Sequence, residues 1–454
     1  MGGKISSKRF MPLKAICFSM AFFIFSYHLG FCAELGRAAH ELFLKDAILI
    51  AYKGNKEIQL DEYGIAIARA NIMEARSGFL PDVNLVASYT RNYKTREPPN
   101  IFTGYKNNNV LGVTLAESVY DGGSTISKFN QAKLGFKVSE ETLRAKKLDI
   151  EFETKRLYYG LLLAYEVERI AKDLVSKAQA HYEETEGLFK QGIVSRFDVL
   201  QSKVQVSLLI PELVRAGNAI EVINAEFMKL LSLKIRDVVK PKSELLCNFI
   251  EPREDEFLKI AYLNKPEMIL KSLNIDVKKW GIELSKSGWR PQLNVNAGYN
   301  YTAGNLNDMF TPKQDNWNAG VSLSIPLFDG FSTKGKVDAA KAQYSQSIIS
   351  KEQVVDGVAV DIRKGCLNLA QARAIINSQK DNLGEAKEAL RLSEVRLRNG
   401  VGINLDVIDS EVALGQVEKN IAEGTYDYLM AQAFLDLTMG NSYIKEELDE
   451  KNKT

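Results

Sequence analysis

The sequence SGWRPQLNVNAGY at residues 287–299 decides how this chain folds, because SGFLPDVNLVASY at residues 77–89 repeats it without a gap. The two stretches share Ser, Gly, Pro, Asn, Ala and Tyr at the same places. Apolar residues recur at helical spacing before each Pro and alternate after it, so each copy passes from helix to strand at Pro81 or Pro291. The chain therefore contains two copies of one structural plan.

The match extends outward from this stretch in both copies. Tyr120-Asp121-Gly122 corresponds to Phe328-Asp329-Gly330, and Gly192 with Asp198-Val199-Leu200 corresponds to Gly400 with Asp406-Val407-Ile408. Together with the two prolines, the Asp-Gly pairs mark the predicted junctions between strands and helices: Pro81, Asp121, Gly122, Pro291, Asp329 and Gly330. We predict a first repeat at residues 34–245, a second at 246–445, and a polar tail at 446–454.

The start of the chain has the build of a secretory signal, predicted at residues 1–33. Basic residues precede an apolar run at residues 15–27, which is short of the ~20 residues that a helical membrane span needs. Gly30 and Cys32 fit an ordinary cleavage site, and Cys32 alternatively fits a lipoprotein signal. No later segment is apolar for long enough to form such a helix, so any membrane passage must be made by strands.

Four segments alternate in polarity and are predicted as strands of about ten residues, the length of a tilted transmembrane strand. They lie at about 83–91, 110–120, 292–302 and 316–327. In the third, Leu293, Val295 and Ala297 share one parity while asparagines fill the other, so one face suits lipid and the other water. A soluble antiparallel sheet with one wet face would alternate in the same way.

Tyr89, Tyr299, Tyr301 and Trp317 could form an interfacial aromatic girdle on these strands. Glu117 falls on the apolar parity of the second strand, which marks either a position beyond the hydrocarbon or a shift at the strand end. Four strands leave two unpaired edges, and about eight are the minimum for a closed barrel, so copies of the chain must pool their strands. A trimer would supply twelve.

Long helices are predicted at about 125–190, 198–233, 333–398 and 405–439, too long for one compact core. In the third, apolar residues recur every seven positions, which predicts left-handed supercoiling against neighbouring helices. They are Val355, Ile362, Leu369, Ile376, Leu383, Leu390 and Leu397. Pro211 should kink or locally unwind the second helix. Residues 234–253 are predicted to be a linker packed outside the main helices.

This order of elements resembles the TolC-type outer-membrane efflux protein family. The residues that carry the resemblance are Leu80-Pro81-Asp82-Val83, Arg290-Pro291-Gln292-Leu293, Leu327-Phe328-Asp329-Gly330, and Gly400 through Asp406-Val407-Ile408-Asp409. The resemblance implies a mainly α fold with a small β part, in which long coiled-coil hairpins form an α-barrel across the periplasm. It also implies a homotrimer with a twelve-stranded barrel in outer-membrane lipid.

The function that the resemblance implies is a passive exit duct of a tripartite efflux pump or a type I secretion system. Its implied partners are a periplasmic adaptor and an inner-membrane pump or ABC transporter. The cargo would be a drug, a metal, a small molecule or a protein, and the sequence does not distinguish these classes. The alternative is a structural coiled-coil stalk or scaffold of the cell envelope without a conducting lumen.

Carried over by position, the family's constriction carboxylates fall on Asp406 and Asp409, and a gate aspartate of the first copy falls on Asp198. At two further gate positions this chain has Leu397 instead of Tyr and Gly402 instead of Arg. Capping of a helix start is the alternative role for Asp198 and Asp406. Asp409 lies three residues after Asp406, where like charges on a helix repel, and this favours a pore-facing role.

The two turns between the long helices are the expected docking points for the adaptor. The residues concerned are Gly192, Arg196, Arg398, Gly400 and Gly402. The two glycines at 192 and 400 suit the left-handed conformation that ends a helix.

No catalytic pattern is present, so we expect neither an enzyme nor a cofactor. His28, His40 and His181 are too few for a histidine-based metal centre, and no Walker or complete dinucleotide fingerprint occurs. Cys247 and Cys366 are isolated small hydrophobic residues rather than a disulfide scaffold. The 59 Lys and Arg against 57 Asp and Glu give no basic footprint for nucleic acid.

Overall fold

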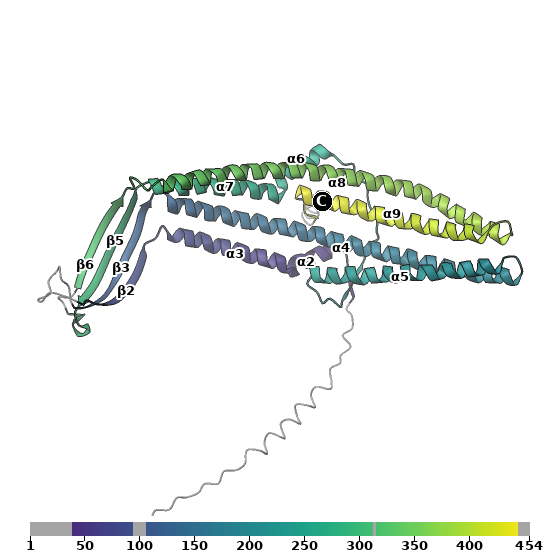
Figure 1. The fold of residues 1–454 in the computed structure, drawn as a ribbon, viewed down its shortest axis with the longest axis horizontal. Helices are drawn as coiled ribbons and strands as arrows, with labels where there is room; N and C mark the ends of the chain where they lie inside the picture. The colour runs from purple at the N-terminus through teal and green to yellow at the C-terminus, as the bar shows by residue number, and fades with distance from the viewer. Residues whose placement is uncertain (1–38, 94–105, 312–314, 444–454) are drawn as a thin grey trace, which may run out of the picture.

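The computed structural model describes residues 39–93, 106–311 and 315–443 (Figure 1). The predicted signal peptide and the polar tail lie outside the described residues. Each repeat runs through a short helix, a strand hairpin, a long helix and a second helix, in the predicted order. The first repeat comprises α3 (Lys56–Ser77), β2 (Asp82–Arg91), β3 (Asn107–Asp121), α4 (Ser124–Lys190) and α5 (Arg196–Leu230). The second comprises α7 (Pro266–Lys286), β5 (Gln292–Ala303), β6 (Asp315–Ser324), α8 (Ser332–Arg398) and α9 (Asn404–Met439).

The molecule is an elongated layer of helices with a small sheet at one end (Figure 1). Helices α4 and α8 have 67 residues each, roughly 100 Å at the rise of an α-helix. Beyond the middle of the molecule the helices lie in the order α8, α9, α4, α5, because α9 packs on α8 and on α4 while α5 packs on α4. The layer therefore has α5 and α8 at its two edges.

The four long strands form one antiparallel sheet in the order β2-β3-β5-β6. Directly opposed residues share a face, and Leu85, Val113, Tyr299 and Trp317 form one continuous row across all four strands. The next row, Val83, Leu115, Ala297 and Ala319, lies on the same face. The predicted apolar parities of the four strands thus coincide on a single face of the sheet.

The opposite face is polar and closely packed, because asparagine side chains lie over glycines of the neighbouring strand. A Cβ at Gly298 would lie 2.7 Å from the Asn318 Oδ1 atom, and one at Gly320 would lie 3.2 Å from the Asn296 Oδ1 atom. Glycine at these places leaves room for the amide of the opposed residue.

Two details at the strand ends bear on the predictions. The register of β3 against β5 shifts between Ser118 and Tyr120, so Glu117 does mark a shift near the strand end. The predicted end of the fourth strand at 327 is wrong, because β6 stops at Ser324. Pro326 cannot donate to a strand ladder, and Ser324 already pairs with Gln292, the first residue of β5.

The junctions between sheet and helices have the same construction in both copies. The Asp121 carboxylate accepts hydrogen bonds from the Thr125 backbone nitrogen and hydroxyl, both at 2.6 Å, at the start of α4. Asp329 accepts one from the Thr333 nitrogen at 2.8 Å at the start of α8. Pro81 and Pro291 directly precede β2 and β5, where the absent N–H costs no ladder bond. Gly122 and Gly330 have positive φ angles of 72° and 66°.

The seven-residue repeat of α8 forms the core between α8 and α9. Ile362, Leu369 and Ile376 are fully buried, and Leu390 and Leu397 belong to a second apolar cluster nearer the far end. Helix α5 continues through Pro211, so the predicted local unwinding is absent. Pro211 is exposed, where water can bind the carbonyl group that lacks an amide partner.

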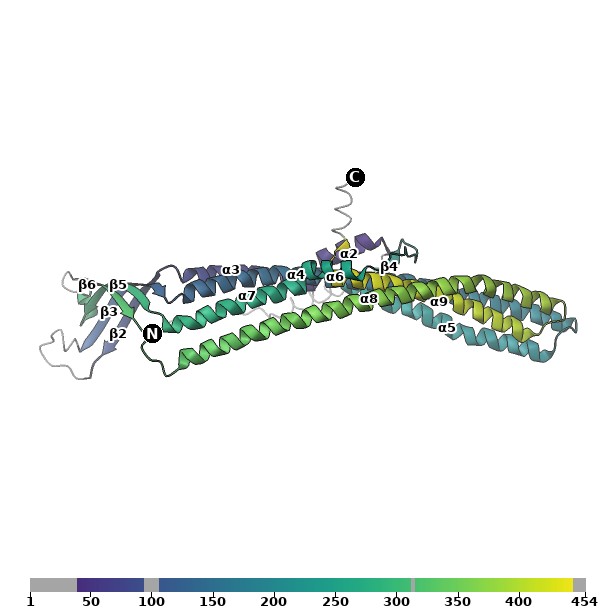
Figure 2. The same cartoon turned by 90° about the horizontal axis from the view of Figure 1, so that it is seen from above.

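At mid-length a set of short elements packs on one side of the helical layer, as Figure 2 shows. They are β1 (Ala39–Leu42), α2 (Leu44–Gly54), β4 (Val238–Pro241) and α6 (Glu254–Asn264), with β1 and β4 paired in parallel. Phe249 of the connecting segment packs edge-on against Tyr428 of α9 at 5.2 Å. The segment at 234–253 thus covers the outside of the main helices, as predicted.

Buried ionic groups join α4 to α9 at the same level. The Lys155 ammonium lies 3.1 Å from both the Glu151 and the Asp436 carboxylates. Glu151 also accepts hydrogen bonds from Tyr52 and from the Tyr443 backbone nitrogen. Because every charged partner here is satisfied, the cluster can fix the relative register of the two repeats.

In the described segments, no helix has both the length and the apolar composition of a membrane span.

Candidate functional site: the far tips of the hairpins

The turn between α4 and α5 and the turn between α8 and α9 lie together at the end opposite the sheet (Figure 1). Both α4 and α8 end in the same hydrogen-bonded motif. The Ile193 nitrogen donates to the Leu188 carbonyl, and the Val401 nitrogen donates to the Arg396 carbonyl, each at 3.0 Å. Gly192 and Gly400 between them have φ angles of 75° and 70°, which a side chain would strain.

The helix that follows the first turn begins with a capping box. Ser195 is the N-cap residue of α5, and its hydroxyl accepts a hydrogen bond from the Asp198 nitrogen at 3.3 Å. In return the Asp198 carboxylate accepts bonds from the Ser195 nitrogen and hydroxyl, at 2.8 and 2.7 Å. The capping role considered for Asp198 is therefore present, and α5 starts two residues before the predicted position because Ser195 caps it.

The second turn lacks this device. Ile403 occupies the N-cap position of α9 and offers no side-chain hydrogen bond. Asp406 is half-buried and Asp409 is exposed, and within the described residues neither carboxylate has a hydrogen bond or an ion pair. The capping interpretation of Asp406 is thus wrong as a matter of hydrogen bonding, although its charge still favours the helix start.

A buried polar cluster joins the two hairpins close to these turns. The side-chain oxygen of Asn404, the first residue of α9, accepts a hydrogen bond at 2.7 Å from the Nε2 atom of His181 on α4 and another at 3.2 Å from the Ser202 hydroxyl of α5. The Asn404 amide donates to the Asp198 carbonyl at 3.3 Å. Thr185 completes the cluster beside Ser202, and all four side chains are at most 7% exposed.

Further from the turns, α9 meets α4 over a small residue and a buried acid. A Cβ at Gly415 would lie 2.6 Å from Leu174 of α4, so the two helices are in close contact there. Glu411, one turn nearer the tip, is only 5% exposed. Burial, and after it the Glu394 carboxylate of α8, raises the pKa of Glu411 to about 7, while Lys177 of α4 opposes the shift. We call this α4–α9 contact, from Leu174 to Thr185 and from Asn404 to Gly415, the tip seam.

The arginines predicted at the docking surface differ from each other. The Arg398 guanidinium lies 2.7 Å from the Glu184 carboxylate of α4, so it already links the two hairpins. Arg196 is exposed at the first residue of α5 and, among the described residues, has no ion pair or hydrogen bond through its side chain.

Leu397 and Gly402, the two departures from the family's gate pattern, have structural roles here. Leu397 is 4% exposed within the apolar cluster at the tip. A Cβ at Gly402 would lie 2.9 Å from the Leu397 backbone nitrogen, so no side chain fits without moving the turn. Polar latching through these two positions is therefore absent, and the tip seam provides the polar contacts between hairpins instead.

Several residues of this site were not singled out from the sequence: His181, Thr185, Ser202, Asn404, Glu411 and Glu184. For one of them, His181, the sequence did carry a signal. His181 lies seven residues after Leu174 and seven before Leu188, at a place where the repeat of α4 calls for an apolar side chain. No group of three or more His, Cys, Asp or Glu side chains that could hold a metal ion occurs in the described part of the chain.

Comparison with known proteins assigns the chain to a family. The sequence profile described as "Outer membrane efflux protein" matches residues 49–231 and again residues 258–441, most of the chain. The chain belongs to the outer membrane efflux protein family. This is a family of TolC-like outer-membrane channels with helices in the periplasm, so the protein is an efflux channel of the outer membrane and not an enzyme.

The efflux protein is similar in sequence to distant relatives of known name. It is 21% identical to the outer membrane protein TolC of Vibrio cholerae, over 83% of this chain and 86% of the relative. It is 20% identical to the alkaline protease secretion protein AprF of Pseudomonas aeruginosa, over 73% and 69%. Its fold matches the solved structure of VceC from Vibrio cholerae with a TM-score of 0.79 and 17% identity, covering 88% of this chain and 96% of that one.

Proposed function

We propose that three copies of this chain assemble into one conducting tube that crosses the outer membrane through a shared twelve-stranded barrel. The observation that carries the proposal is the sheet. Its apolar rows run in register across all four strands, while β2 and β6 pair with only one described strand each. Every residue of β2 is exposed, and so is every residue of β6 except Gly320. Unpaired strand edges in hydrocarbon cost several kcal/mol per group, which pooling of strands removes.

The edge helices support the same assembly. On α5, Phe197, Val204 and Leu208 are more than half exposed, and on α8 so are Val360 and Leu367. Such apolar stripes on the two opposite edges of the helical layer can pack against each other when neighbouring copies meet edge to edge. The exposed stripes thus favour a closed ring of hairpins below the barrel.

In this tube Asp406 and Asp409 of the three copies form a cation-attracting constriction at the far tip. Their carboxylates lie on one helix face at i and i+3, where like charges repel. No described neighbour neutralises either of them. Asp198 belongs to the same constriction by position, but its carboxylate is engaged in the α5 capping box.

The proposed partners are a periplasmic adaptor, which binds the hairpin tips, and an inner-membrane pump or ABC transporter, which drives transport. The channel itself is passive and serves a tripartite efflux pump or a type I secretion system. Arg196 and the turn at Gly192 are the proposed docking surface, because Arg398 is held by Glu184 within the chain.

Reconstitution into planar lipid bilayers tests this function. We expect discrete conductance steps from the purified, processed protein. A coiled-coil stalk without a lumen would insert no such steps, and that result would overturn the proposal. Gly415→Leu serves as a control that disturbs the tip seam through Leu174 without touching the sheet.

Docking is tested with Arg196→Glu in cells that carry the pump. We expect weaker efflux at an unchanged amount of assembled channel in the membrane. The matched control exchanges the internal pair as Arg398→Glu with Glu184→Arg, which preserves the ion pair. Unchanged transport by Arg196→Glu would exclude docking through this side chain.

A further inference from the structure

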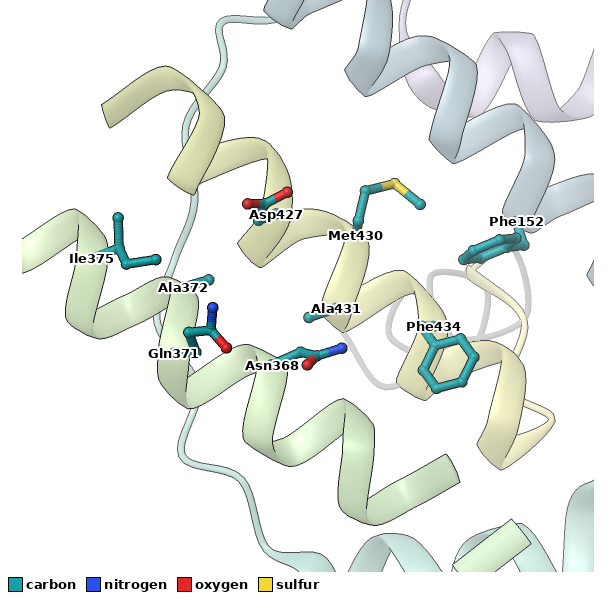
Figure 3. Close-up of a pocket in the computed structure, with 9 residues that line it drawn as sticks. All are labelled: Phe152, Asn368, Gln371, Ala372, Ile375, Asp427, Met430, Ala431 and Phe434. Carbon is teal, nitrogen blue, oxygen red and sulfur yellow. The ribbon is translucent and has the colours of Figure 1, made fainter. Parts of the chain in front are cut away.

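A groove about 370 Å³ in volume lies where α4, α8 and α9 meet, far from the tip constriction (Figure 3). Its floor is formed by Ala372 of α8 and Ala431 of α9, which are 2% and 5% exposed. Two alanines facing each other across a helix pair leave a space that larger core residues would fill. The groove lies roughly 35 Å along α9 from its first residue, at 1.5 Å per residue.

The lining of the groove combines large apolar side chains with one charge. Phe152 of α4 and Met430 and Phe434 of α9 form its apolar wall. The only charged side chain among the nine described lining residues is Asp427 of α9. Figure 3 shows Asp427 on one side of the groove and the amides of Asn368 and Gln371 on the α8 side.

The polar groups of the groove are available to a ligand. Within the described chain, neither the Asp427 carboxylate nor the two α8 amides has a hydrogen-bond or ionic partner. Burial, and after it the Glu423 carboxylate, raises the pKa of Asp427. A bound cation would relieve the repulsion between these two acids.

The groove opens on the side of the helical layer opposite the short elements at mid-length. Arg373 and Lys380 of α8 lie over Phe249, in the segment that connects β4 and α6 on the side of the short elements. Gln371 precedes Arg373 by two residues, about 200° around α8. On α9, Met430 follows Tyr428 by two residues and so lies about 200° around the helix from it, and Tyr428 packs on Phe249. In a ring of hairpins with the short elements outside, the groove faces the lumen.

We propose that this groove is a luminal binding site for hydrophobic organic cations, one site in each copy. The proposal rests on the proposed tube, because only the tube makes this face a channel wall. Asp427 supplies the countercharge, Asn368 and Gln371 offer their amide oxygens, and the aromatic rings and Met430 hold the apolar body of the ligand. The site would select cargo by charge on its way through the tube.

The test uses two probes of the same shape and opposite charge, tetraphenylphosphonium and tetraphenylborate. Equilibrium dialysis against the detergent-solubilised full-length protein, corrected with empty micelles, should give saturable binding of the phosphonium at one per chain. Asp427→Asn should weaken this binding at least tenfold. Glu418→Gln, the same change on the same helix but lining a cavity beside the outer segment Ser243–Leu246, should leave it unchanged.

Three results would overturn the site: no saturable phosphonium binding, equal binding by Asp427→Asn, or borate binding as tight as phosphonium binding. Burial of the groove by a second copy in the assembly would show as the first of these. Dialysis does not depend on conductance. Asp427-dependent binding without conductance steps would therefore keep the groove as a cation-binding site but reject both the duct and the luminal place of the site. Conductance without such binding would keep the duct and reject the site.

Discussion

The two hairpin tips have one backbone and different side-chain chemistry. In both, the long helix ends in the same pair of turn hydrogen bonds around a glycine of positive φ. In the first, Ser195 and Asp198 satisfy each other in a capping box. In the second, Ile403 replaces the serine, and Asp406 keeps a carboxylate that no described group binds. The repeat thus preserves the turn while it separates a structural aspartate from one that is available for function.

Other residues near Asp198 and Asp406 also differ between the two tips. Asn404 of the second repeat lies in the buried cluster with His181 and Ser202, whereas Arg196 at the matching place of the first repeat is exposed. Glu411 is buried, and its counterpart Lys203 is exposed. The second hairpin is therefore the one that meets its neighbour through polar and titratable groups, so its contact with α4 is the part of the tip best suited to open.

The largest expected effect comes from removing the two unpaired acids. Asp406→Ala with Asp409→Ala should raise the concentration of hexamminecobalt that blocks half the conductance by at least tenfold, because three copies lose six carboxylates. Asp198→Ala should shift the block less than the double variant does, because it removes half as many carboxylates and these already accept hydrogen bonds within the cap. Equal block of the double variant and the wild type in planar bilayers would contradict the constriction.

The polar cluster gives the next effect. Asn404→Ala should cost the tip seam about 1–3 kcal/mol, because it leaves His181 and Ser202 buried without their shared partner. Hydrogen exchange of the amides at 178–185 should then be about fivefold faster or more. Arg196→Ala, at the matching place of the first repeat, should not change exchange there. If both variants exchange alike, the two tips do not differ as described.

Acidity should affect the tip seam through Glu411 of the second hairpin. The pKa of Glu411 is raised to about 7, so the closed seam binds this proton more tightly than a separated one does. The stability that Glu411 contributes to the seam is then fully present below the ordinary carboxyl pKa of about 4.5 and is lost as the pH rises through 7. Exchange at 178–185 should therefore accelerate from pH 5 to 7.5 after correction for intrinsic rates. In Glu411→Gln the corrected exchange rate should not change over this pH range. If the rate in the wild type is equally constant, Glu411 does not control the stability of the seam.

The smallest effect is on capping. Asp198→Ala should destabilise the first turn of α5 by about 1 kcal/mol, the usual cost of a lost cap. Asp406→Ala should change the start of α9 by a few tenths of a kcal/mol at most, since only its interaction with the helix dipole is lost. Local exchange at 195–200 and 403–408 measures both. If Asp406→Ala destabilises the start of α9 more than Asp198→Ala destabilises the start of α5, the assignment of the structural role to Asp198 is wrong.

Most of the fold could be predicted from the periodicity of apolar residues in the sequence. The alternation in four short segments predicted which residues share a face, and the sheet register aligns Leu85, Val113, Tyr299 and Trp317 as that alternation requires. The seven-residue repeat of α8 predicted Ile362, Leu369 and Ile376, all fully buried. Such patterns are visible because burial of many side chains in a row fixes them.

The tip was less visible in the sequence, since its contacts depend on how two distant hairpins meet. The bond between His181 and Asn404 joins residues far apart in the chain, and no local spacing reveals it. The capping box of Ser195 and Asp198 could have been predicted from the sequence, because Ser with an acid three residues later is a recognised helix start. The end of β6 was mispredicted because an apolar run continued past Ser324 while Pro326 ended the ladder.

The mass of the processed protein in solution tests the central claim most directly, namely that one chain cannot seal its sheet and three chains share it. Native mass spectrometry from detergent should give a complex of three chains, and removal of detergent should precipitate it. A stable monomer in water without detergent would contradict the account, because the apolar rows of the sheet and its two open edges would then need no partner.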